Sequence, residues 1–213
     1  MRTDDLIDAL AMETPAAPVG LPFRRIAIAA GLGAIAALAV VMAWLGPRPD
    51  LHVAMRGGFF WIKFAYAASF AISGAALADR YGRPGGRGRW RWALVFAPVA
   101  VLAVMAVAAA LGEGVRQMHA DWMGQSWNVC PFRILALAVP SFLGALWAFR
   151  RLAPTRLGLA GFAAGLLAGG VSAAVYSLAC QESTALFVVT WYTLGIFACG
   201  GVGALLGPRL LRW

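Results

Sequence analysis

The sequence LGLAGFAAGLLAGGVSAAVYSLA, residues 157–179, carries no charged side chain and is long enough to cross a bilayer as a helix, which takes about 20 residues. Its glycines Gly161, Gly165 and Gly169 recur every four residues, so they share one face of that helix. Small residues at this spacing let a neighbouring helix approach closely. The same spacing recurs further on, at Gly195, Cys199 and Gly203. We interpret both faces as helix-packing surfaces rather than as the lining of a pore.

Five further apolar runs resemble this one, and the chain of 213 residues is 62% hydrophobic and only 13% charged. Soluble domains contain about 25% charged residues, so this composition is typical of a membrane protein. The first run lacks the small-residue cleavage site of a signal peptide and is read as a span. We therefore predict an all-α membrane domain over residues 26–213, with six transmembrane helices at roughly 26–45, 58–78, 93–111, 132–149, 157–179 and 186–206.

The basic residues predict the orientation of these spans. The segments 1–25, 79–92, 150–156 and 207–213 hold three, five, three and two basic residues, which is 13 of the 18 in the chain. Because basic residues concentrate in cytoplasmic loops, both termini are expected in the cytoplasm. The formal net charge of +9 is thus explained by topology, and we do not expect direct DNA binding.

Residues 1–13, MRTDDLIDALAME, read as a short amphipathic helix that ends before Pro15. Asp4 and Asp5 lie in the first turn, where the helix dipole stabilises negative charge. The aliphatic residues form one narrow apolar stripe along the helix. A helix of about 11 residues is marginal in water, so it needs a partner surface. A Pro- and Gly-rich tether follows, and we assign residues 1–25 to partner binding through Thr3, Asp4, Asp5, Leu6, Ile7 and Leu10.

The predicted spans contain no Asp, Glu or His, which argues against a proton relay, an ion path or a cofactor site inside the membrane. Lys63 lies near one end of the second span, where its side chain could reach the surface. His52 and His119 fall in loops, where we expect solvated side chains rather than metal ligands. The sequence therefore predicts no catalytic residues and no resident cofactor.

Two of the three cysteines are predicted at the outer surface of the membrane. Cys130 precedes Pro131 at the start of the fourth span, where the helix dipole and Arg133 favour a thiolate. Cys180 ends the fifth span, where the dipole acts in the opposite sense. Such a pair suits disulfide formation or capture of a soft metal ion. Two unconnected interfacial cysteines remain the alternative, and Cys199 is expected to be a core residue.

Several segments together resemble the bacterial family called negative regulator of sigma F, a family of membrane anti-sigma factors. They are MRTDDLI at 1–7, the loop containing Cys130, RRxAPTR at 150–156, CxES at 180–183, FVVTWYxLG at 187–195 and GPRLLRW at 207–213. The resemblance implies a six-span protein of the bacterial inner membrane that sequesters an extracytoplasmic-function sigma factor. It also implies release under heavy-metal or oxidative stress through two outward-facing cysteines, whose positions Cys130 and Cys180 match.

A second functional class remains at this stage, a small membrane thiol-redox enzyme or carrier. Such a protein would need a second cysteine pair to pass electrons on, and only Cys199 remains for that role. Under the anti-sigma interpretation the chain is not an enzyme. Its partners are then a sigma factor and the lipid bilayer, with a soft metal ion bound only transiently at the cysteines.

Overall fold

The computed structural model describes residues 21–82, 89–112, 115–150 and 154–212, together with Thr3 and Met12. Throughout these ranges the regular structure is helical. The elements are α2 (Leu21–Val40), η1 (Val41–Leu45), α3 (Leu51–Arg56), α4 (Gly58–Tyr81), η2 (Arg89–Trp92), α5 (Ala93–Ala110), α6 (Val115–Met123), α7 (Cys130–Phe149), α8 (Leu157–Tyr176), α9 (Ala185–Phe187), η3 (Val188–Tyr192) and α10 (Thr193–Leu210).

Six helices are long and apolar enough to cross a membrane, which confirms the predicted number of spans. They are Arg24–Leu45, Gly58–Tyr81, Trp90–Ala110, Cys130–Phe149, Leu157–Tyr176 and Ala185–Leu210. Many large apolar side chains on the outside of the bundle are exposed, as lipid-facing residues are; they include Leu32, Ile72, Val104, Leu143 and Leu205. Exposing such a surface to water is unfavourable, whereas lipid acyl chains are as apolar as these side chains.

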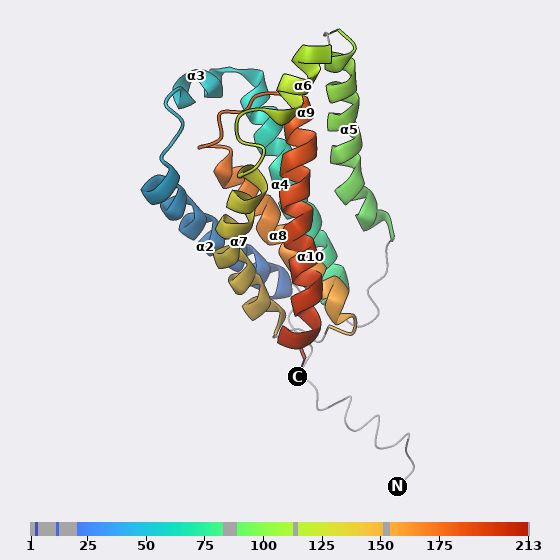
Figure 1. The fold of residues 1–213 in the computed structure, drawn as a ribbon. Coiled ribbons are helices and arrows are strands. Elements are labelled where there is room, and N and C mark those ends of the chain that lie inside the picture. The colour runs from blue at the N-terminus through green and yellow to red at the C-terminus, as the bar shows by residue number, and fades with distance from the viewer. Residues whose placement is uncertain are drawn as a thin grey trace.

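Helix α8 occupies the middle of the bundle and packs against α4, α7 and α10 (Figure 1). Its close approach to α10 follows from the glycines that the sequence singled out. A β-carbon at Gly161 would overlap the carbonyl oxygen of Gly203, and one at Gly165 would overlap the carbonyl oxygen of Cys199. The predicted packing role of both small-residue faces is thus confirmed, at the α8–α10 contact for Cys199 and Gly203 and against α7 for Gly195, which lies beside Ile134 and Pro131.

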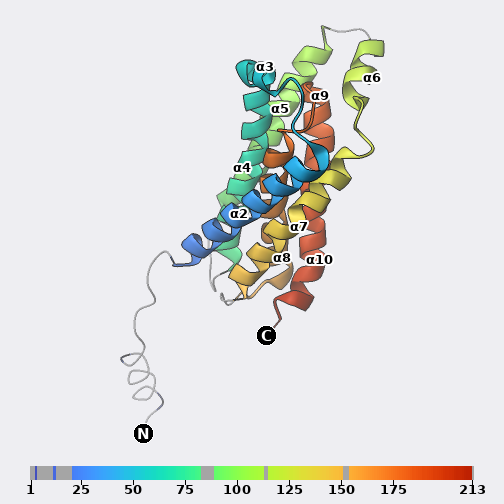
Figure 2. The ribbon, with the colours of Figure 1, turned by 90° about the vertical axis from the view of Figure 1, so that its left-hand side faces the viewer.

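The contact between α4 and α8 is equally close and was not predicted. A β-carbon at Gly74 of α4 would overlap the backbone nitrogen of Leu167, and one at Gly170 of α8 would overlap that of Ala71. Helix α2 lies outside this core against α7 and crosses it obliquely (Figure 2). Helix α5 packs against α4 and α9 at another edge (Figure 1).

The two ends of the bundle differ in what they carry. The start of α2 and the end of α10 lie at one end, which we call the terminal end (Figure 1). The opposite end, the loop end, carries α3, α6 and the connection between α8 and α9 (Figure 1). The segment 112–131, predicted as a loop, contains the nine-residue helix α6. Its Trp122 packs on Trp191, with ring centroids 5.9 Å apart, which holds the helix against the bundle.

The predicted N-terminal helix lies almost entirely outside the described residues. Thr3 and Met12 are helical and exposed. The other residues assigned to partner binding, Asp4, Asp5, Leu6, Ile7 and Leu10, are not among those described, so their role stays a prediction.

Candidate functional site

The connection between α8 and α9, residues 177–184, forms the centre of the candidate site, and we call it the cysteine loop. After Tyr176 the chain makes a turn, and the backbone N–H of Cys180 donates to the Tyr176 carbonyl oxygen at 3.0 Å. Residues 180–184 then run without regular structure to α9. Neighbouring elements supply hydrogen bonds that fix this irregular backbone in position.

Arg48 ties the cysteine loop to the segment between η1 and α3. Its backbone N–H donates to the Leu178 carbonyl oxygen at 3.0 Å, and its guanidinium donates to the Cys180 carbonyl oxygen at 3.3 Å. The same guanidinium makes two hydrogen bonds of 2.7 Å with Asp50. This contact holds the pKa of the Asp50 carboxyl below its ordinary value and raises the pKa of Arg48. The side chain of Arg48 is thereby kept in one orientation, aimed at the loop.

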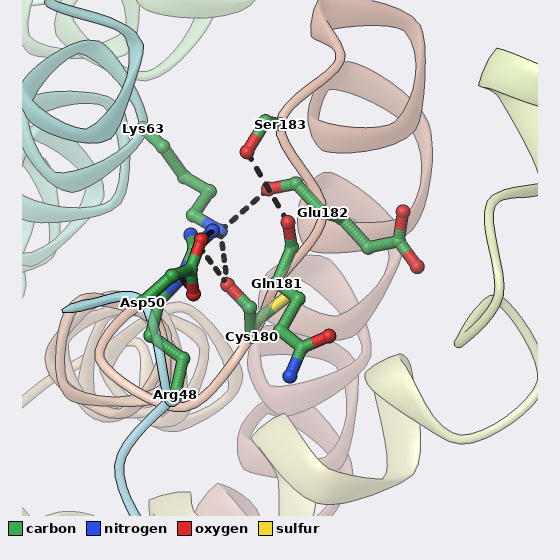
Figure 3. A network of polar contacts seen from close by, with 7 residues as sticks. All are labelled: Arg48, Asp50, Lys63, Cys180, Gln181, Glu182 and Ser183. Atoms are coloured by element: carbon green, nitrogen blue, oxygen red, sulfur yellow. Dashed lines mark hydrogen bonds and ion pairs between the residues drawn. The ribbon is translucent and has the colours of Figure 1, made fainter. Parts of the chain in front are cut away.

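Lys63 of α4 reaches the same loop from another side (Figure 3). Its Nζ donates to the carbonyl oxygens of Cys180 at 2.9 Å and Glu182 at 2.8 Å. The side chain is only 1% exposed, so the prediction that it reaches outward to the surface is wrong. Two carbonyl acceptors inside the bundle replace the water that an exposed amine would find. The ring of Tyr192 adds a cation–π contact, with Nζ 5.5 Å from its centroid.

The carboxylate of Glu182 points away from Lys63 and joins the cysteine loop to the α6–α7 connection (Figure 3). It accepts hydrogen bonds from the backbone N–H groups of Gln125 at 2.7 Å and Ser126 at 3.1 Å, and from Ser126 Oγ at 3.1 Å. Thr184 Oγ1 also donates to the Asp121 carbonyl oxygen at 2.7 Å. The loop is therefore held by three separate segments of the chain.

Both predicted sensor cysteines lie at the loop end of the bundle, but neither is exposed. Cys130 is the first residue of α7 and is 0% exposed, and Cys180 is 3% exposed. The prediction of two surface thiols is wrong because the cysteine loop and the α6–α7 connection cover this end of the helices. The two residues are electrostatic neighbours of each other and of Tyr176 and Tyr192.

All three cysteines are free thiols in this structure. Cys199 is buried in α10 against Gly165 and Gly169 of α8, which confirms its prediction as a core residue. His52 and His119 are exposed, as predicted for solvated histidines. Among the described residues, no group of three or more His, Cys, Asp and Glu side chains is arranged to hold a metal ion. A metal at this site would thus rest on the two thiols.

A cavity of about 350 Å³ at the loop end has Cys180 among its lining residues. Arg133 projects into it from α7 and donates to the Tyr176 hydroxyl at 3.4 Å. The lining is mostly polar, and its residues are Gln125, Ser126, Arg133, Tyr176, Ala179, Cys180, Gln181 and Glu182.

Comparison with known proteins assigns the chain to a family. The family model described as negative regulator of sigma F matches residues 10–213. The chain belongs to this family. An anti-sigma-F factor from Caulobacter vibrioides is 44% identical to it, and a probable anti-sigma-F factor from Azospira oryzae is 40% identical, each across the whole of both chains. No solved structure matches the chain significantly. The resemblance stated from the sequence motifs is confirmed.

In this member of the family, sequence reasoning missed Arg48, Lys63 and Glu182 as parts of the site. Lys63 carried a usable signal, because it is the only lysine of the chain and lies inside a predicted span. An ionisable residue in a membrane span is a functional candidate by default. Glu182 stood in the motif CxES at 180–183, but its contact with the α6–α7 connection could not be read from the sequence. Arg48 carried no signal, since the Cys180 carbonyl lies 132 residues further along the chain.

Proposed function

We propose that this protein is a membrane-bound anti-sigma factor that holds an extracytoplasmic-function sigma factor at the cytoplasmic face and releases it when Cys130 and Cys180 are modified. The observation that carries the proposal is the family match over residues 10–213, joined by identities of 44% and 40% to two proteins named as anti-sigma-F factors. Because those identities extend over the entire length, the inference does not depend on one motif.

We place the terminal end of the bundle in the cytoplasm and the cysteine loop on the opposite side of the bacterial inner membrane. The support is the distribution of basic residues, 13 of 18 of which fall in segments expected on the terminal side. In this orientation the partner-binding segment and the thiols lie on opposite sides of the membrane. A signal from outside can then act without entering the cell.

The partner contact is assigned to the first 25 residues. Leu6, Ile7 and Leu10 serve as anchors of a helix that folds into an apolar groove of the sigma factor, and Asp4 and Asp5 meet its basic residues. So short a segment buries less than a standard interface of about 1,600 Å². Confinement to the membrane raises the effective concentration of the contact and compensates for its small area.

The sensing step is assigned to the cavity beside Cys180. A soft cation binds thiolate sulfur strongly, and an oxidant can join two neighbouring thiols as a disulfide. Either change alters the resting arrangement of the cysteine loop, which the three tethering segments hold in place. Release of the sigma factor requires that the altered arrangement bind it more weakly than the resting one.

The test is co-purification of the full-length protein, solubilised in mild detergent, with the cell's sigma factors. We expect a small soluble sigma factor to co-elute, and the Leu6→Asp/Leu10→Asp double variant to lose it, because interface anchors contribute about 2 kcal/mol or more each. Membrane insertion of the variant should equal that of the parent. A double variant that still retains the sigma factor would refute the helix-anchor contact.

A further inference from the structure

Lys63 is a buried donor committed to the cysteine loop. Both hydrogen bonds that its Nζ makes within the described part of the chain go to loop carbonyl oxygens, those of Cys180 and Glu182. A buried amine that loses its acceptors is left unsatisfied at considerable cost in free energy. Lys63 therefore favours the one position of the loop that offers it both oxygens.

The two acceptors bracket the backbone of the sensor residue. One is the carbonyl of Cys180 itself, and the other lies two residues further along (Figure 3). A rotation of the backbone at Cys180 or Gln181 separates these oxygens, so Nζ cannot follow both of them. Any rearrangement of the loop that accompanies modification of the Cys180 thiol thus weakens its attachment to α4.

Lys63 is also an electrostatic neighbour of both thiols, Cys130 and Cys180. A soft divalent cation binds such thiols as thiolates and releases their two protons, so the net charge of the site does not rise, but both sulfur atoms must turn toward one ion. Arg48, which donates to the same Cys180 carbonyl, adds positive charge to this neighbourhood. Drawing the Cys180 sulfur toward an ion also shifts the carbonyl of the same residue, which is an acceptor for Lys63, so cation binding and this hydrogen bond are in opposition.

We propose that Lys63 is the positioning residue that holds the cysteine loop closed in the resting protein and leaves the loop when a soft divalent cation binds the thiols. The proposal rests on the sensing role given above to Cys130 and Cys180. Lys63 sets the balance between closed and open loop, because an interaction present in one state alone biases the equilibrium toward that state.

The chain offers a direct test, because Lys63 is its only lysine. Purified full-length protein in detergent is treated with sulfo-N-hydroxysuccinimide acetate, and acetylation at residue 63 is followed by mass spectrometry with the α-amine of the chain as internal reference. We expect slow acetylation at rest and acceleration on the order of tenfold with Cd²⁺. The Cys130→Ser/Cys180→Ser variant should show no acceleration. A rate at Lys63 that Cd²⁺ leaves unchanged would overturn the proposal.

Substitutions supply a second readout, the sigma factor retained by immobilised protein without any added metal. Lys63→Met keeps the apolar stem and removes the donors, so release should rise on the order of tenfold, and also in the Cys130→Ser/Cys180→Ser background. Lys63→Arg keeps the donors and should retain the partner. Arg116→Met, which removes an exposed charge from α6 at the same end, is the matched control and should behave as the parent. Equal retention by Lys63→Met and the parent would contradict the proposal.

The two proposals fail in different ways. If Cd²⁺ accelerates acetylation of Lys63 but the sigma factor stays bound, Lys63 positions the loop and the proposed sensing function is wrong. If Cd²⁺ releases the sigma factor while Lys63 stays unreactive, the sensing function stands and the role of Lys63 is refuted. Should Lys63→Met fail to insert, the acetylation experiment on the unaltered chain still decides.

Discussion

The α8–α10 contact and the cysteine loop are held by different kinds of interaction. Between α8 and α10, glycines bring backbone against backbone, and a β-carbon at Gly161 or Gly165 has no room. At the loop, a few directional hydrogen bonds from Arg48, Lys63 and the α6–α7 connection hold an irregular segment. The α8–α10 contact is the sum of many weak dispersion interactions, so no single ligand can replace it. The second can be undone by one change in charge or covalent state.

Because of this difference, we expect one region to set the stability of the bundle and the other to set the response of the protein to a signal. Close packing at the centre keeps the bundle intact in either functional state, because packed interiors deform little. The polar loop end is the part suited to rearrangement, since its hydrogen bonds can be exchanged for bonds to water or to a ligand. A substitution in the centre should therefore change unfolding, and one at the loop should change the response to a signal.

The largest effect is expected from adding one methyl group to the centre. Gly165→Ala places a β-carbon against the carbonyl oxygen of Cys199 and should lower the free energy of unfolding by about 2 kcal/mol or more. Gly201→Ala, on α10 with open space around it, should be neutral or stabilising by up to about 1 kcal/mol because alanine favours helix. Thermal unfolding in detergent measures both. Equal melting temperatures would show that the α8–α10 contact is looser than described.

An intermediate effect is expected at the thiols, and it should appear in response rather than stability. Cys130→Ser/Cys180→Ser should keep the sigma factor bound but abolish its release by Cd²⁺. The substitutions thereby remove a coupling of about 1–3 kcal/mol between metal binding and sigma-factor binding. Cys199→Ser, which alters the third thiol in the packed centre, should respond to Cd²⁺ as the parent does. A double variant with an unaltered metal response would place sensing elsewhere in the protein.

The smallest effect is expected from Asp50→Asn, which removes the carboxylate that orients Arg48. At neutral pH the melting temperature should barely change, since ion pairs with an exposed partner contribute little. The pKa of Asp50 is lowered in the folded protein, so its contribution is present above the unfolded value of about 4 and is lost as pH falls through the folded value. The parent should therefore lose slightly more stability in acid than the variant. A steeper loss in the variant would contradict this role for Asp50.

The sequence predicted the spans well and the loop end poorly. Hydropathy and span length are properties of consecutive residues, so six runs of apolar residues led to six helices. The glycine face of residues 157–179 was also readable, because a four-residue period fixes a face of a helix before its neighbour is known. The matching glycines Gly74 and Gly170 were not recognised, because each stands without a repeat of the same spacing.

At the candidate site the sequence placed Cys130 and Cys180 at the same end of the bundle, as the structure does, but misjudged their surroundings; their sensor role stays a prediction. Cys130 and Cys180 were expected at the surface because each begins or ends a span. Both are buried in the folded chain, where residues 125–126 meet the cysteine loop through hydrogen bonds to Glu182. Lys63 was expected to reach outward for the same reason, since its acceptors lie 117 and 119 residues further along the chain.

The sequence by itself determined that this chain crosses a membrane, how many times it does so and which family it resembles. These properties depend on local composition and on short motifs, which act before any tertiary contact forms. Only the tertiary structure decided that Cys130 and Cys180 are buried, that Cys180 lines a cavity and that the only lysine donates to the loop. Hydrogen bonds and burial depend on which distant residues meet, and that is set by how the six helices pack.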